Sequence, residues 1–208
     1  MVYSNFKTIA QARTAFNLTV DDTRDCFSGS KPIQPSQYLR ATLDEYLPLA
    51  SAINTEKARS ELIVAPVLLE VRRIFKGRIG FFSGTEFEVE PEAGLNGFCD
   101  YLLTASTDLY EIRRPVVTLV EAKNENIKGG LGQCIAEMVA AQRFNQQQGE
   151  ELDPIYGAVT TGNIWKFLRL VNYTIFIDIG DYYIKEIDKI LGILAEPFAE
   201  ELGLGVGL

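Results

Sequence analysis

The stretch that decides the fold is PVVTLVEAK, residues 115–123, in which an apolar run ends in an acid and a lysine two positions apart. A continuous apolar run of this length is typical of a central strand that is covered on both faces. Successive side chains of a strand point to opposite faces, so Glu121 and Lys123 project to the same side. The stretch therefore predicts a buried strand that delivers a charged pair to one edge of a sheet.

The segments around this strand predict a layered α/β fold. Two extended segments precede it, TEFEVEPE (85–92) and NGFCDYLLTA (96–105), and apolar residues at helical spacing predict a helix from about Gly130 to Gln147. Three more strands and a final amphipathic helix follow, at 154–162, 164–172, 173–180 and 184–202, before a frayed tail at 203–208.

Upstream, apolar residues at helical spacing predict a helix over 54–75, capped by Asn54 and kinked or split at Pro66. Residues 1–50 combine a short helix, TIAQARTAF, with a turn-rich stretch, and we interpret them as an N-terminal extension that packs on the core. Residues 51–208 form the α/β domain. The order of elements predicts a mixed β-sheet flanked by helices.

The amino-acid composition limits the kinds of catalytic and binding site that the chain can form. The 208 residues include no histidine, which excludes Ser-His-Asp triads, HExxH zinc sites and histidine general bases. The net charge of -8 argues against a broad basic face for nucleic acid, so such a role needs a local basic patch or a partner. Cys26, Cys99 and Cys134 have no metal-like spacing and are interpreted as reduced core thiols. No membrane span is predicted, and we expect a cytoplasmic protein.

A second carboxylate completes a candidate metal site. If the strand over 96–105 pairs with the EAK strand, Asp100 comes beside Glu121. Two carboxylates and a backbone carbonyl make a hard oxygen site suited to Mg²⁺ or Mn²⁺, with water and phosphate oxygens completing the octahedron. The alternative is a solvated ion pair between Glu121 and Lys123 at the end of a strand.

The order of the predicted elements and the residues of these motifs together resemble the PD-(D/E)XK nuclease superfamily. The core of that superfamily consists, in chain order, of a helix, three strands, a helix and a strand. The likeness covers roughly residues 54 to 162 and implies a restriction endonuclease-like three-layer fold of αβββαβ order. It implies that Asp100 and Glu121 are the metal-binding acids, that the Ala122 carbonyl completes the set, and that Lys123 orients or activates the attacking water. Cys99 stands where the family pattern has proline.

The resemblance adds two positions. Some branches carry a glutamine on the helix after the EAK strand, followed four residues later by an aromatic residue. Only Gln133 matches this pattern, because the second position, on the same helical face, is Glu137. A plain contact between helix and sheet is the alternative for both. The first helix of the superfamily often supplies an extra acid. Glu56, Glu61 and Glu70 qualify by location, and Glu61, one turn before Pro66, is our choice as a further metal ligand.

Two basic clusters are candidates for holding a phosphate backbone if they face one way: EVRRIFKGR (70–78) and EIRRP (111–115).

The sequence thus predicts a Mg²⁺-dependent nuclease, with DNA favoured over RNA as the substrate. One alternative is a catalytically silent nuclease fold that acts as a protein-binding or regulatory module. Another is a small-molecule enzyme that uses the same acids. A homodimer or a protein partner is compatible with all three.

Overall fold

The computed structural model describes residues 2–150 and 153–204, and its centre is an open mixed β-sheet of eight strands. The order in the sheet is β1-β7-β6-β5-β4-β3-β2, with the short β8 paired to β6. The pairs β1·β7 and β4·β5 are parallel and the others are antiparallel. The strands are β1 (Thr19–Asp21), β2 (Gly80–Glu86), β3 (Phe98–Thr104), β4 (Val116–Ala122), β5 (Ile155–Thr160), β6 (Ile164–Val171), β7 (Thr174–Ile177) and β8 (Tyr182–Tyr183).

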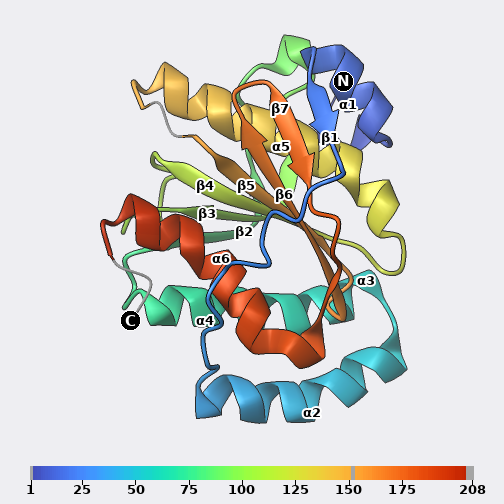
Figure 1. The fold of residues 1–208 in the computed structure, drawn as a ribbon, viewed down its shortest axis with the longest axis vertical. Coiled ribbons are helices and arrows are strands. Elements are labelled where there is room, and N and C mark those ends of the chain that lie inside the picture. Colours follow the sequence, from blue (N-terminus) through green and yellow to red (C-terminus); the bar gives the residue numbers. More distant parts are fainter. Residues whose placement is uncertain (1, 151–152, 205–208) are drawn as a thin grey trace.

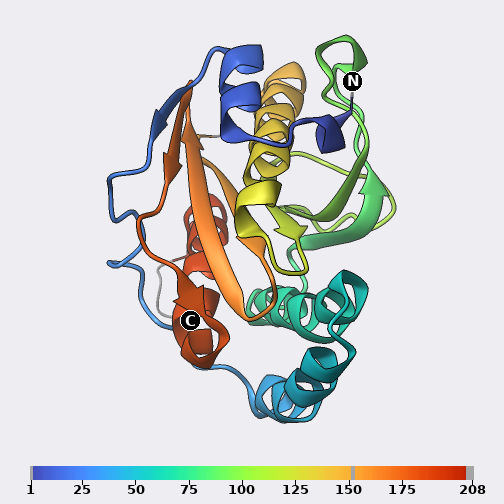
Figure 2. The same ribbon diagram turned by 90° about the vertical axis from the view of Figure 1, so that its right-hand side faces the viewer.

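Helices cover both faces of this sheet. One face carries α1 and α5, and the other carries α4 and α6 with α2 outside them (Figure 1). Figure 2 shows the same layers after a quarter turn. The helices are α1 (Ile9–Phe16), α2 (Gln37–Ile53), α3 (Glu56–Arg59), α4 (Ala65–Ile74), α5 (Ile127–Gln147) and α6 (Ile187–Glu201). Shorter turns lie at η1 (Tyr3–Asn5), η2 (Ser60–Val64), η3 (Pro91–Ala93) and η4 (Ile184–Glu186). The predicted α/β class, with a mixed sheet flanked by helices, is confirmed.

The central strand is as buried as its sequence predicts. All seven residues of β4 are buried, and β4 lies between β3 and β5 in the sheet. Asn145 of α5 fixes one end of this strand, because its side chain accepts a hydrogen bond from the Val116 amide and donates one to the Val116 carbonyl, each at 2.8 Å. These bonds hold α5 against the strand that carries Glu121.

The helix predicted over 54–75 is split, and its cap differs from the prediction. Thr55, not Asn54, caps the start, since its side chain accepts from the Ala58 amide. Asn54 instead ends α2 in the left-handed conformation, at φ 52°. The segment η2 is a π-helical turn between α3 and α4, and Pro66 lies in the first turn of α4, directly after this π-helical turn.

The strand predicted over 85–92 is wrong for most of its length. The observed strand β2 ends at Glu86, and Phe87 and Val89 instead donate their amides to Gly97 and Leu95 in a local turn. Alternating apolar and acidic residues favoured a strand, but η3 begins at Pro91 and bends the chain back. The next two strands, β3 and β4, lie within their predicted ranges.

The N-terminal region is more ordered than the sequence indicated. The short helix is confirmed as α1, with a capping box between Thr8 and Gln11. The sequence did not predict α2, which crosses the boundary drawn between residues 50 and 51. The strand β1 joins the sheet beside β7, so this region supplies part of the α/β core itself.

The glycines at the start of α5 allow close packing. A Cβ on Gly130 would lie 2.7 Å from Val159 and 3.1 Å from Cγ of Lys123, and one on Gly132 would lie 2.6 Å from the carbonyl oxygens of Phe6 and Thr8. The distances of 2.6 and 2.7 Å are shorter than the contacts that a Cβ makes in proteins. The glycine run therefore serves packing of α5 against the sheet and the N-terminal segment. None of the helices in the described part of the chain combines the length and apolar character that a membrane span requires. Of the predicted tail, residues 205–208 lie outside the described part.

Candidate functional site

Strands β3 and β4 bring Asp100 and Glu121 together. The two strands are antiparallel with Tyr101 opposite Val120, so the same register continued by one residue places Asp100 opposite Glu121. Oδ2 of Asp100 accepts a hydrogen bond of 2.8 Å from the Ala122 amide. The neighbourhood expected from the sequence is confirmed, because the register of these two strands fixes it.

Lys123 lies within the same group. Its ammonium donates to Oε1 of Glu121, and its own side chain is largely buried. Burial lowers the pKa of Lys123, but the Glu121 carboxylate outweighs that effect, so the net pKa lies above the usual value. Lys123 is thus a fixed cation at neutral pH, suited to orient a water or a phosphate rather than to remove a proton.

Glu137 is a third acid of this group, reaching the sheet from α5. Its side chain is fully buried, and its Oε1 accepts a hydrogen bond of 3.0 Å from Nε2 of Gln133. Gln133 and Glu137 therefore share one face of α5, as their spacing of four residues predicted. Burial, together with the Glu121 carboxylate, raises the pKa of Glu137 well above its usual value. Glu137 is therefore held in its neutral form beside Glu121.

The acids at the centre of the site are poorly satisfied. Glu121 is 1% exposed, and burial, followed by the charge of Asp100, raises its pKa to about 8. Burial also raises the pKa of Asp100, although the Ala122 amide and the Lys123 ammonium act in the opposite direction. Oε2 of Glu121 and Oε2 of Glu137 have no hydrogen-bond partner in the described part of the chain. Such oxygens call for a shared proton or a bound cation.

A small pocket opens at Asp100. Its volume is about 270 Å³. The lining combines acids with three hydroxyl groups, in the residues Glu56, Lys57, Ser60, Glu61, Ser83, Gly84, Asp100, Tyr101 and Ala122. Tyr101 donates to the Ser60 carbonyl at 2.9 Å, and its hydroxyl lies 2.6 Å from that of Ser60. The same carbonyl also accepts a hydrogen bond from the Ala65 amide, which closes the π-helical turn. The pocket gives solvent a path to Asp100 and the Ala122 backbone.

The residues present fit a hard divalent cation with few protein ligands. Across residues 2–150 and 153–204, no three His, Cys, Asp or Glu side chains form a metal-binding group. Two carboxylates, one with an unpaired oxygen, nevertheless match the way Mg²⁺ is held, through one or two carboxylates with water and phosphate completing its shell. Asp100 and Glu121 would hold the ion, with the Ala122 carbonyl as the backbone ligand.

The three candidate acids of the first helical region have different surroundings. Glu61 lines the pocket, but its side chain is 62% exposed and lies 3.6 Å from Lys57. Glu56 also lines the pocket, accepts from the Asn124 amide at 3.1 Å, and is one of the charges that raise the pKa of Asp100. Glu70 lies elsewhere, bonded to Ser36 and Arg73. Glu56 is thus coupled to the site more directly than Glu61, our choice from the sequence.

The two basic clusters do not gather at the site. Arg113 and Arg114 precede Val116, which lies about 17 Å from Glu121 along β4. The 70–78 cluster leads into Gly80, which pairs with Thr104 at the far end of β3 from Asp100. Their arginines are also engaged with protein groups. The contacts are Arg72 with the Ile79 carbonyl, Arg73 with Glu70, Arg113 with Asp108 and Glu111, and Arg114 with Glu150.

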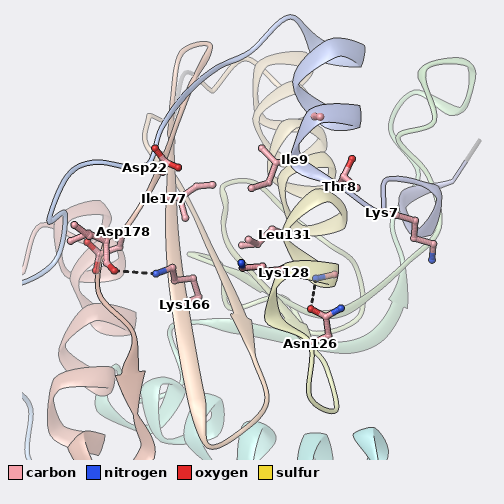
Figure 3. Close-up of a pocket in the computed structure, with 13 residues that line it drawn as sticks. Lys7, Thr8, Ile9, Asp22, Asn126, Lys128, Leu131, Lys166, Ile177 and Asp178 are labelled. Atoms are coloured by element: carbon pink, nitrogen blue, oxygen red, sulfur yellow. Dashed lines mark hydrogen bonds between the residues drawn. The ribbon is translucent and has the colours of Figure 1, made fainter.

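A larger hollow of about 680 Å³ lies between the start of α5, α1 and the β6–β7 region (Figure 3). None of the residues predicted for chemistry lines it. The ammonium of Lys166, one of its lining residues, is held by the carbonyls of Ile179 and Gly180 and by Asp181 at 2.9 Å. Volume alone therefore does not make this hollow the site, and Asp100 lies at the smaller pocket.

The thiols offer no competing nucleophile. Cys99 and Cys134 are buried and unpaired, and burial raises the pKa of each well above its usual value. Their interpretation as core thiols is confirmed, whereas Cys26 is only partly buried. The sequence did not indicate Tyr101 as a pocket residue, because its hydrogen bonds to Ser60 join residues that are 41 positions apart.

Comparison with known proteins adds no family assignment. No protein-family model matches the sequence, and a search of curated proteins finds no match.

Proposed function

We propose that this protein is a metal-dependent phosphodiesterase of the PD-(D/E)XK type that hydrolyses nucleic acid, with DNA favoured over RNA, in the cytoplasm. The observation that carries the proposal is the meeting of Asp100, Glu121 and Lys123 at adjacent strand ends, beside a pocket. The order α4, β2, β3, β4, α5, β5 supports a restriction endonuclease-like core.

Each residue has a role in this mechanism. Asp100, Glu121 and the Ala122 carbonyl hold Mg²⁺ or Mn²⁺, which when bound offsets phosphate charge and lowers the pKa of a water. Lys123 stays protonated and positions the water or a phosphate oxygen. Gln133 keeps the neutral Glu137 in place through its hydrogen bond, so that Glu137 does not add a third charge beside Glu121.

The first test is calorimetric titration of Mg²⁺ and Mn²⁺ into the wild-type protein and Glu121→Gln. We expect binding in the wild-type protein and none in the variant. Glu70→Gln is the matched control, because Glu70 is equally buried but lies outside the site. A nuclease assay with Asp100→Asn completes the test.

Binding that survives Glu121→Gln would overturn the metal assignment. Cleavage that survives Asp100→Asn would overturn the catalytic one. Absence of metal binding in the wild-type protein would favour a silent nuclease fold that acts as a protein-binding module, for which the net charge of -8 is the supporting observation.

A further inference from the structure

The shape of the pocket limits the substrate that the acids can reach. At about 270 Å³ it lies at the lower end of pockets that hold small ligands. Its rim carries Glu56 and Glu61 beside a single lysine, Lys57. A duplex carries one charge per about 1.7 Å of axis, twice the density of one strand. Such a rim disfavours a duplex more than a single strand.

The cations that a duplex requires are elsewhere. The basic clusters at 70–78 and 111–115 lie at the other end of β3 and β4, and Arg73, Arg113 and Arg114 are in ion pairs. Arg59 of α3 precedes the pocket residue Ser60 directly in the chain. Asn54 and the Thr161 carbonyl hold its guanidinium, and no carboxylate among the described residues forms an ion pair with it. A single guanidinium that is held in this way suits the phosphate backbone of one nucleic-acid strand.

An exposed aromatic ring stands beside the site. Phe98 is 65% exposed, although it lies in β3 only two residues from Asp100. Phe98 and Asp100 flank Cys99, which packs in the core cluster on the α5 face, so both side chains point away from that face. The Cα atoms of Phe98 and Asp100 are about 7 Å apart along the strand. Proteins that bind single strands stack bases on rings of this kind.

We infer that the site accepts a single unpaired nucleic-acid strand, with a base stacked on Phe98 and the adjoining phosphate at Asp100 and Glu121. The inference rests on the proposed function and names its substrate class. The small hydroxyl-lined pocket, the acidic rim, the single fixed guanidinium and the exposed ring all fit one flexible strand. A strand that is free to bend reaches the pocket, whereas a rigid duplex meets the rim first.

The test is fluorescence anisotropy with a labelled short oligothymidylate and the same strand annealed to its complement. Calcium replaces magnesium so that binding is measured without cleavage. We expect the single strand to bind at least about tenfold more tightly than the duplex. Phe98→Ala should weaken binding of the single strand about tenfold, the loss typical of one base stack. Tyr110→Ala is the matched control, because Tyr110 is 99% exposed in the loop before β4.

Equal or tighter binding of the duplex would overturn the inference. So would unchanged binding in Phe98→Ala, an equal loss in Tyr110→Ala, or no binding of either probe. Failure of the proposed function is separate, since it appears as loss of metal binding or of cleavage in the wild-type protein, whichever strand binds. Circular dichroism spectra of both variants should match the wild-type spectrum, because both rings are largely exposed.

Discussion

Two buried glutamates, Glu70 and Glu121, differ in how the fold satisfies them. Glu70 is 3% exposed and accepts from the Ser36 amide at 2.8 Å, the Ser36 hydroxyl at 3.0 Å and Arg73 at 2.6 Å. Glu121 is 1% exposed, has one lysine at Oε1, and lacks a partner at Oε2. The first carboxylate anchors a helix start, whereas the second is left incomplete.

The difference indicates which of the two buried acids has a structural role and which belongs to the candidate functional site. A fully bonded carboxylate has no remaining capacity for a ligand. An incompletely bonded one costs stability unless something completes it, and such costs gather at functional positions. The neighbours agree, because Glu121 has two acids beside it and Glu70 has an arginine.

The largest expected effect is on catalysis. Glu121→Gln and Asp100→Asn should each lower the rate of cleavage on the order of a thousandfold, because each removes part of a cation's contribution of several kcal/mol to transition-state stabilisation. Glu70→Gln should leave the rate within about twofold. Single-turnover cleavage with excess enzyme measures all three. Comparable losses at Glu70 and Glu121 would erase the distinction between the two acids.

The next largest expected effect is on stability, where Glu70 should matter more than Glu121. Glu70→Ala should destabilise the protein by about 3 kcal/mol, because it leaves the Ser36 amide and hydroxyl unbonded where they are partly buried. Glu121→Gln should change stability by less than about 1 kcal/mol or increase it, since it removes a buried carboxyl group of which one oxygen has no partner. Urea unfolding without metal measures both. A larger loss in Glu121→Gln than in Glu70→Ala contradicts the comparison.

The raised pKa of Glu121 also predicts a pH dependence of stability. Its pKa rises from 4.5 to about 8 on folding, so between these values the folded protein binds more protons than the unfolded chain. Stability from this group is therefore present below about pH 4.5 and is lost as the pH rises towards 8. The free energy of unfolding of the metal-free protein should fall across this window. Glu121→Gln should flatten the decline, and an unchanged slope in that variant would assign it to other groups.

Sequence patterns predicted the centre of the fold better than its edges. The apolar run before Glu121 identified β4, since a strand that is covered on both faces needs no alternation. The pairing of Asp100 with Glu121 followed from consecutive strands with a connection long enough to reverse. In contrast, α2 and the turn after Glu86 escaped prediction, because tertiary contacts override weak local patterns there.

Sequence patterns likewise predicted only part of the candidate site. Residue type and spacing indicated Asp100, Glu121 and Lys123, and helical periodicity placed Gln133 and Glu137 towards the strand. Neither residue spacing nor helical periodicity shows how deeply a side chain is buried. The neutral state of Glu137 and the cationic state of Lys123 could therefore be inferred only from the structure. The choice of Glu61 over Glu56 and Glu70 stays a prediction, since all three lie in helical segments and only packing separates them.

The smallest expected effect distinguishes Glu56 from Glu61. Glu56→Gln should weaken Mg²⁺ binding about threefold, because it removes a charge that acts on both Asp100 and Lys123. Glu61→Gln should change the affinity by less than about twofold, since solvent and Lys57 already screen its exposed carboxylate. Calorimetry at low ionic strength resolves effects of this size. A loss of binding in Glu61→Gln would show that Glu61 is a metal ligand after all, and that its exposure reflects a side chain that turns inward only with the ion.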